Sequence, residues 1–350
     1  MTWTELHEAC EYQLTNKIVE VARHHPEFVL RVDDHGSTPL HILCLGDGRK
    51  ASSISSEITA QAIQAILEAC PSVAREKDFH GNTPLHIACS SNQSDKHIVK
   101  LLLEAHPEAA MVCNKEGLQP LHMACRYAPD EEVIGLLIEF YPKAVQHCIK
   151  MGSPAPKKRR GHETDHAVID HNEGMAQANF LKLRYENVSN QQVRDGAYPI
   201  HMAIQSHAPI AVLEMLVKAG SETSEESILL KRNKFGETPL HIALRARDRD
   251  EELGPKDREM IDEMIVEMLL KSSPDSSRIR CGKEKGGNLP IHLAAMYGCS
   301  VHVAKDLLET WPESIHEKNG DGLTPMELAN RHGHCSNEVM RLFAITDAAT

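Results

Sequence analysis

One nine-residue segment returns along this chain and constrains its fold more than any other feature. Its copies are GSTPLHILC at Gly36, GNTPLHIAC at Gly81, GLQPLHMAC at Gly117, GAYPIHMAI at Gly196, GETPLHIAL at Gly236, GNLPIHLAA at Gly287 and GLTPMELAN at Gly322. A worn copy, TELHEAC, begins at Thr4, and from His7 onward the motif position advances by 34, 45, 36, 79, 40, 51 and 35 residues. Recurrence at a nearly fixed step predicts a stack of similar modules instead of one reactive site.

Each residue of the motif has a local structural role. Gly permits the positive φ that ends a turn, Thr caps a helix through its hydroxyl, and Pro suits the first helical position, where a missing N–H costs nothing. The His bonds polar groups of the turn and bridges to the next module. After each copy comes an apolar helical run such as HIVKLLLEAHPEAA, which a Pro closes; the run after His201 uses Gly220 instead. Every module therefore reads as a turn, a short helix, a reverse helix and a loop.

The pattern T-P-L-H-x-A at these steps resembles the ankyrin repeat. The resemblance implies an all-α ankyrin-repeat solenoid of about eight helix-turn-helix units with β-turn or hairpin fingers. We expect one array over residues 1–350, with units at about 1–32, 33–77, 78–113, 114–149, 192–232, 233–283, 284–318 and 319–350. We expect residues 150–191 to be a long, partly disordered insertion in a finger loop. Gln119, Tyr198 and Leu289 replace the capping Thr, and Glu327 replaces His in a terminal capping unit.

The charge and composition point to a protein partner. The formal net charge is −12, which argues against a broad nucleic-acid footprint, and aromatic residues make up 4%, which is low for sandwiches and barrels. No apolar run is long enough for a membrane helix, and the first residues do not read as a secretory leader. We therefore expect a cytoplasmic monomer with no cofactor, no small-molecule substrate and no membrane attachment.

The cysteines and histidines of the motif are interpreted as structural. Cys44, Cys89 and Cys125 occupy the same place in successive copies, so modules stacked at helix-pair spacing would hold them beyond disulfide reach. We expect free, buried thiols in a reducing compartment. No Gly-rich phosphate loop or nucleophile elbow is present. The chain is therefore not expected to be an enzyme.

Two motifs inside the insertion suggest other functions. PKKRR, with Lys157, Lys158, Arg159 and Arg160, has the composition of a nuclear import signal, and the alternative is a solvated loop. A working signal would make the protein a nuclear regulator. HETDH, residues 162–166, matches the H-E-x-x-H pattern of zinc peptidases, with Glu163 activating a metal-bound water. Its surroundings offer few apolar positions to bury such a helix, so a zinc-dependent hydrolase is a remote alternative and adventitious metal affinity a milder one.

The resemblance also places the binding surface. Ankyrin-repeat proteins usually hold partners on the concave side, with fingertip residues and the last positions of the inner helices. The positions carried over to this chain, with the large aromatic and Arg side chains favoured as anchors, are Phe79, His80, Asn82, Lys115, Arg126, Tyr127, Lys234, Phe235, Arg245, Met296 and Tyr297. The alternative for each aromatic ring is to fold back onto a neighbouring finger. The favoured function is a non-catalytic scaffold or adaptor; the targeting subunit of an enzyme complex is a variant of it.

Overall fold

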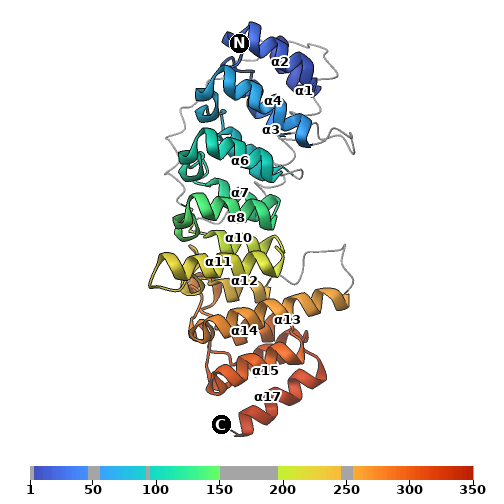
Figure 1. The fold of residues 1–350 in the computed structure, drawn as a ribbon. Coiled ribbons are helices and arrows are strands. Elements are labelled where there is room, and N and C mark those ends of the chain that lie inside the picture. The colour runs from blue at the N-terminus through green and yellow to red at the C-terminus, as the bar shows by residue number, and fades with distance from the viewer. Residues whose placement is uncertain (1–3, 46–55, 92–94, 150–195, 246–254, 350) are drawn as a thin grey trace, which may run out of the picture. The chain divides into compact units, whose positions relative to one another are not determined.

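The computed structural model describes residues 4–45, 56–91, 95–149, 196–245 and 255–349, in which every regular element is a helix (Figure 1). The α-helices come in pairs of a short inner helix and an outer helix. The inner helices are α1 (Glu5–Glu11), α3 (Pro39–Leu45), α5 (Pro84–Ser90), α7 (Pro120–Tyr127), α10 (Pro199–Gln205), α12 (Pro239–Arg245), α14 (Pro290–Tyr297) and α16 (Pro325–His332). The outer helices are α2 (Thr15–His24), α4 (Ser56–Ala69), α6 (Lys96–Ala105), α8 (Glu131–Phe140), α11 (Ile210–Thr223), α13 (Pro255–Ser272), α15 (Val301–Thr310) and α17 (Asn337–Ala349). The predicted all-α repeat fold is confirmed.

Proline sets both ends of most repeats. The Pro of the motif is the first residue of every inner helix except α1, because its fixed φ suits that position. A second Pro follows most outer helices and starts a 3-10 turn, since its ring cannot continue the helical hydrogen-bond ladder. The turns are η1 (Pro26–Phe28), η2 (Pro71–Arg75), η3 (Pro107–Met111), η4 (Pro142–Gln146), η7 (Pro274–Arg278) and η9 (Pro312–His316), to which η5 (Ile228–Leu230) and η8 (Lys283–Lys285) add two without Pro.

The helices are organised in two compact bodies, each with its own core. The N-terminal body comprises residues 1–144 and 149–195, and the C-terminal body comprises 145–148 and 196–350. Inner helices contact inner helices and outer helices contact outer helices, in the series α1–α3–α5–α7 and α2–α4–α6–α8 of the first body. In the second body the inner series is α10–α12–α14–α16, and α13, α15 and α17 follow one another outside. Leu40, Leu85, Leu121 and Leu240, the motif leucines, are buried in these seams.

Between repeats the chain makes tight turns, the fingers, which adjoin one another through backbone bonds. The Phe79 N–H donates to the His35 carbonyl at 3.0 Å, and the Lys115 N–H donates to the His80 carbonyl at 2.9 Å. Gly36, with φ of 76°, permits this approach: a Cβ there would lie 2.4 Å from the Phe79 ring. Each fingertip of the N-terminal body is thereby fixed to the tip before it.

Candidate protein-binding surface

Within each body, motif histidines join one repeat to the next. His86 Nδ1 accepts the backbone N–H of Thr83 at 3.2 Å and lies 2.9 Å from the Thr83 hydroxyl. A backbone N–H can only donate and a carbonyl can only accept, so the ring proton sits on Nε2, which donates to the Leu118 carbonyl at 3.1 Å. His41 and His241 donate in the same way to carbonyls of the following repeats, at 3.0 and 3.3 Å. The bridging role predicted for His is confirmed.

The joint survives where the capping Thr is replaced. At Gln119, Tyr198 and Leu289 the backbone N–H still donates to the histidine Nδ1, at 3.3, 3.2 and 3.2 Å. In the last repeat the Thr324 N–H donates to Glu327 Oε2 at 2.7 Å, so the carboxylate takes the place of the imidazole. The essential bond comes from the main-chain N–H, which every residue except proline supplies.

Burial makes the side chains of the motif histidine and cysteine unreactive. Desolvation lowers the pKa of His86 to about 4, so its ring is neutral at neutral pH. Burial raises the pKa of the Cys89 thiol far above its ordinary range, which keeps the thiol protonated and unreactive. All ten cysteines are free, and Cys44, Cys89 and Cys125 are buried. His86 therefore joins two repeats and Cys89 fills the core, as expected.

Asn82, one of the predicted contact residues, is not accessible to a partner. Its side chain is fully buried: the amide donates to Asp78 Oδ2 at 3.0 Å, and its Oδ1 accepts from Asn114 Nδ2 at 2.9 Å. These bonds tie one finger to the next. A partner cannot reach Asn82, so we remove it from the proposed contact residues.

The other candidates of the N-terminal body present an exposed edge. Phe79 exposes 51% of its surface at a fingertip, and His80 and Lys115 beside it are exposed as well. The Lys115 ammonium donates to the Phe79 carbonyl at 2.5 Å, which holds the two tips together. At the end of α7, Arg126 and Tyr127 are half-buried, and the guanidinium lies 5.3 Å from the Tyr127 ring centroid. The structure thus gives a finger cluster and, at the end of an inner helix, an Arg–Tyr pair.

The candidates of the C-terminal body divide into exposed and internally engaged residues. Lys234 is exposed beside the half-buried Phe235 on one fingertip, and at the end of α14 Tyr297 is 37% exposed next to the half-buried Met296. Arg245 instead pairs with Glu237, whose carboxylate is buried, at 2.9 Å. The sequence did not indicate this ion pair, because Glu237 precedes α12 and Arg245 is the last residue of that helix.

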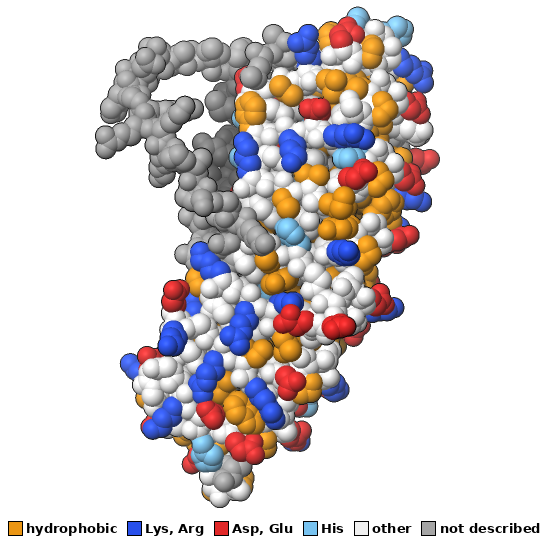
Figure 2. All heavy atoms as spheres, turned by 90° about the vertical axis from the view of Figure 1, so that its left-hand side faces the viewer, with side chains coloured by type: hydrophobic (Ala, Val, Ile, Leu, Met, Phe, Trp, Pro, Cys, Tyr) orange, Lys and Arg blue, Asp and Glu red, His pale blue; other side chains and the backbone are white. Residues whose placement is uncertain are grey.

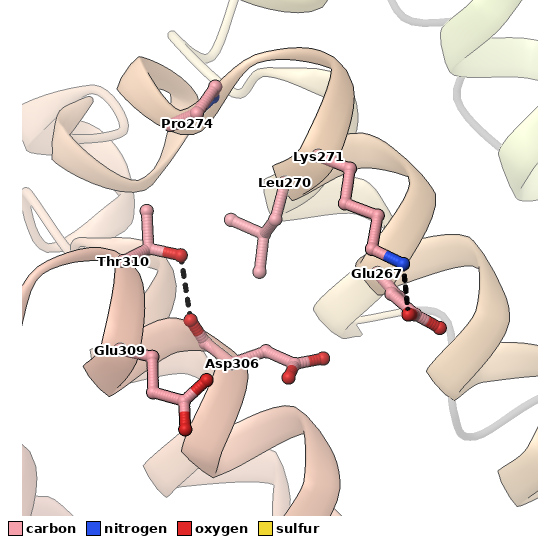
Figure 3. Close-up of a pocket in the computed structure, with 7 residues that line it drawn as sticks. All are labelled: Glu267, Leu270, Lys271, Pro274, Asp306, Glu309 and Thr310. Atoms are coloured by element: carbon pink, nitrogen blue, oxygen red, sulfur yellow. Dashed lines mark hydrogen bonds and ion pairs between the residues drawn. The ribbon is translucent and has the colours of Figure 1, made fainter.

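Two hollows lie on the outer helices. One, of about 320 Å³, lies between α13 and α15 and is lined by Glu267, Leu270, Lys271, Pro274, Asp306, Glu309 and Thr310 (Figure 3). Some of the lining residues already bond to one another. Lys271 pairs with Glu267 at 2.5 Å, and the Thr310 hydroxyl donates to the Asp306 carbonyl at 2.7 Å. The other, of about 680 Å³, lies between α4 and α6. Both hollows are open to solvent and belong to the face opposite the inner helices.

The motifs of the insertion are outside the described residues. Lys157–Arg160 and His162–His166 both fall between 150 and 195, so the import signal and the zinc site stay predictions. Over the residues that the structure does describe, no three His, Cys, Asp or Glu side chains are grouped to hold a metal ion. In that same part of the chain, no helix is long and apolar enough to cross a membrane.

Tandem helix pairs, joined by a His-to-carbonyl bond and by interlocked fingers, define a helical repeat protein. Residues 51–147 match the family model described as ankyrin repeats (3 copies), and the helix pairs of the described residues outside this range have the fold of an ankyrin repeat as well.

Three known proteins are similar over part of their length. NF-kappa-B inhibitor alpha of Rattus norvegicus is 27% identical over 43% of this chain and 43% of its own length. The Mus musculus protein of the same name is 26% identical over 50% of each chain. The ANK repeat-containing protein nipk-1 of Caenorhabditis elegans is 26% identical over 48% of this chain and 25% of its own. The similarity therefore spans half or less of these relatives.

Proposed function

We propose that this chain is a non-catalytic scaffold or adaptor, which holds a protein partner on its fingers and inner-helix ends. The observation that supports this most directly is Phe79, an aromatic side chain 51% exposed on a fingertip. Its backbone is fixed on both sides, by the bond to His35 and by the ammonium of Lys115. A large ring presented on a rigid frame loses little entropy on binding, which is the property of an interface anchor.

The relatives agree with this mode of action. Two of them are named as inhibitors, and an inhibitor acts by binding its target. We take from them only the mode, because the alignment covers half or less of their length. The identity of the partner is left to experiment.

The test is site-directed photo-crosslinking in extract of the native cell. A photoreactive phenylalanine analogue at position 79 should trap a discrete protein, and the same analogue at Ile58, which is 40% exposed on outer helix α4, should not. The double variant Phe79→Ala/Tyr127→Ala should abolish affinity capture of that protein, while the matched outer-face variant Ile58→Ala/Met264→Ala should capture it as wild type does. Capture that survives loss of both anchors, in variants that melt at the wild-type temperature, would refute the proposed surface.

A further inference from the structure

Two fingers of the C-terminal body are far more basic than the chain as a whole. The fingers at 231–237 and 278–288, together the basic finger pair, carry two acids, Glu237 and Glu284, and seven cations, Lys231, Arg232, Lys234, Arg278, Arg280, Lys283 and Lys285, which is a net charge of +5. The fingers of the N-terminal body, 31–37, 75–82 and 113–118, carry four cations and five acids, a net charge of −1. In a chain of net charge −12 this concentration is a local feature. Figure 2 shows several Lys and Arg side chains, interspersed with Asp and Glu, over the lower part of the molecule.

The backbone brings the two basic fingers into contact. The Gly282 N–H donates to the Phe235 carbonyl at 2.8 Å. Both glycines at this junction are needed for the approach, since a Cβ on Gly236 would lie 2.6 Å from the Gly282 nitrogen. Cations that are about fifty residues apart in sequence therefore share one surface.

Phe235 lies at the centre of this surface. The Lys285 ammonium, from the second finger, is 4.8 Å from the centroid of its ring, and the Lys234 ammonium, from the first, is 5.6 Å away. Two like charges are thus held around one aromatic face, whose negative quadrupole attracts both. The arrangement orders two donors before any ligand arrives.

Several of these cations are not neutralised. Lys231 pairs with Glu226, Arg280 pairs with Glu317, and Arg278 lies over the Trp311 ring. Arg232, Lys234, Lys283 and Lys285 are exposed, and none of the four forms an ion pair with another described residue. These four exposed charges are available to pair with an anionic ligand.

We infer that the basic finger pair binds an acidic segment of a partner protein, one rich in Glu and Asp. This inference rests on the proposed function, because it names the partner chemistry for the finger surface of the C-terminal body. Carboxylates would pair with Lys234, Lys285 and their exposed neighbours, and the apolar stems of a peptide would contact Phe235. A protein segment fits better than nucleic acid, whose charge continues along its whole length. The seven cations of the basic finger pair occupy two short segments of a chain whose net charge is −12.

The experiment measures binding of a fluorescein-labelled twelve-residue oligoglutamate to the full chain by anisotropy at low salt. Lys234→Ala/Lys285→Ala should weaken binding about ten-fold, since two exposed charge contacts are lost. The matched control Lys77→Ala/Lys143→Ala removes two exposed lysines of the N-terminal body and should change the Kd less than about two-fold. Added salt should weaken wild-type binding, because the contacts are between exposed charges.

Three outcomes would overturn the inference. They are equal weakening by both double variants, no binding at all, and tighter binding of a twelve-nucleotide single strand or of phosphatidylserine vesicles than of the peptide. Each can be told apart from failure of the proposed function. If the protein trapped at position 79 is still captured in a Phe79-dependent way, the scaffold role stands and only the acidic partner chemistry is lost.

Discussion

At the scale of single residues, the buried carboxylate of Glu237 depends on its charged partner Arg245. Only 3% of its side chain is exposed, its Oε1 lies 2.9 Å from Arg245 Nη1, and its Oε2 accepts from Asn233 Nδ2 at 2.8 Å. The corresponding positions of two other repeats hold neutral side chains, Ser37 and Asn82. A charge removed from water in this way depends on its counterion, and taking away one partner leaves the other uncompensated.

Arg245→Met should therefore lower the free energy of unfolding by about 3 kcal/mol. The compensated double variant Arg245→Met/Glu237→Ser, which copies the residue at Ser37, should recover most of this loss because no buried charge remains. Urea unfolding followed by circular dichroism gives both values. If the single variant lost less than about 1 kcal/mol, comparable to an exposed pair, the ion pair would not be the stabilising contact described here.

At the scale of the structural element, the finger depends on glycine in two distinct ways. Gly236 and Gly322 both have a left-handed backbone, with φ of 71° and 78°. Gly236 also faces the backbone of the next finger, whereas nothing lies within 4 Å of the Cβ that Gly322 lacks. Comparing the two glycines therefore separates the cost of a left-handed backbone from the cost of blocking the contact between fingers.

Gly322→Ala should destabilise the protein by about 1 kcal/mol, the cost of a left-handed alanine. Gly236→Ala should cost about 1 kcal/mol more, because it also displaces Gly282 and breaks its bond to the Phe235 carbonyl. Thermal unfolding of both variants compares the two losses directly. Equal losses would mean that the fingers do not need this contact.

Helix boundaries could be predicted from the sequence wherever a nearby residue sets them. The motif Pro located the starts of the inner helices, and the second Pro located the ends of most outer helices, because both act through their own backbone geometry. The burial of Asn82 was not predictable: a tip residue turns inward only because Asn114 of the next finger meets it. The same is true of the Glu237–Arg245 pair. The basic residues of KRNKF and RIRCGKEK were visible in the sequence, but their convergence depends on how two fingers adjoin.

At the scale of the whole molecule, motif histidines of both bodies are held in the same neutral tautomer. In His86, His241 and His292, burial lowers the pKa to about 4, and burial also lowers the pKa of His7 and His41. Protonating such a ring would place a hydrogen on Nδ1, which now accepts the N–H of the preceding cap. Acid therefore acts on the joints between repeats throughout the array.

The sign of the pH dependence follows from these pKa values. An unfolded histidine takes up a proton near pH 6.5 while the folded ring stays neutral down to about pH 4, so stability is complete above 6.5 and falls as the pH drops through this window. Between pH 7 and pH 5 each of the three deeply shifted rings should cost about 2 kcal/mol. His86→Gln, which does not titrate, should reduce the loss by about that amount. Urea titrations at pH 7, 6 and 5 test this, and an identical pH dependence for wild type and His86→Gln would show that the repeat joints do not sense acid.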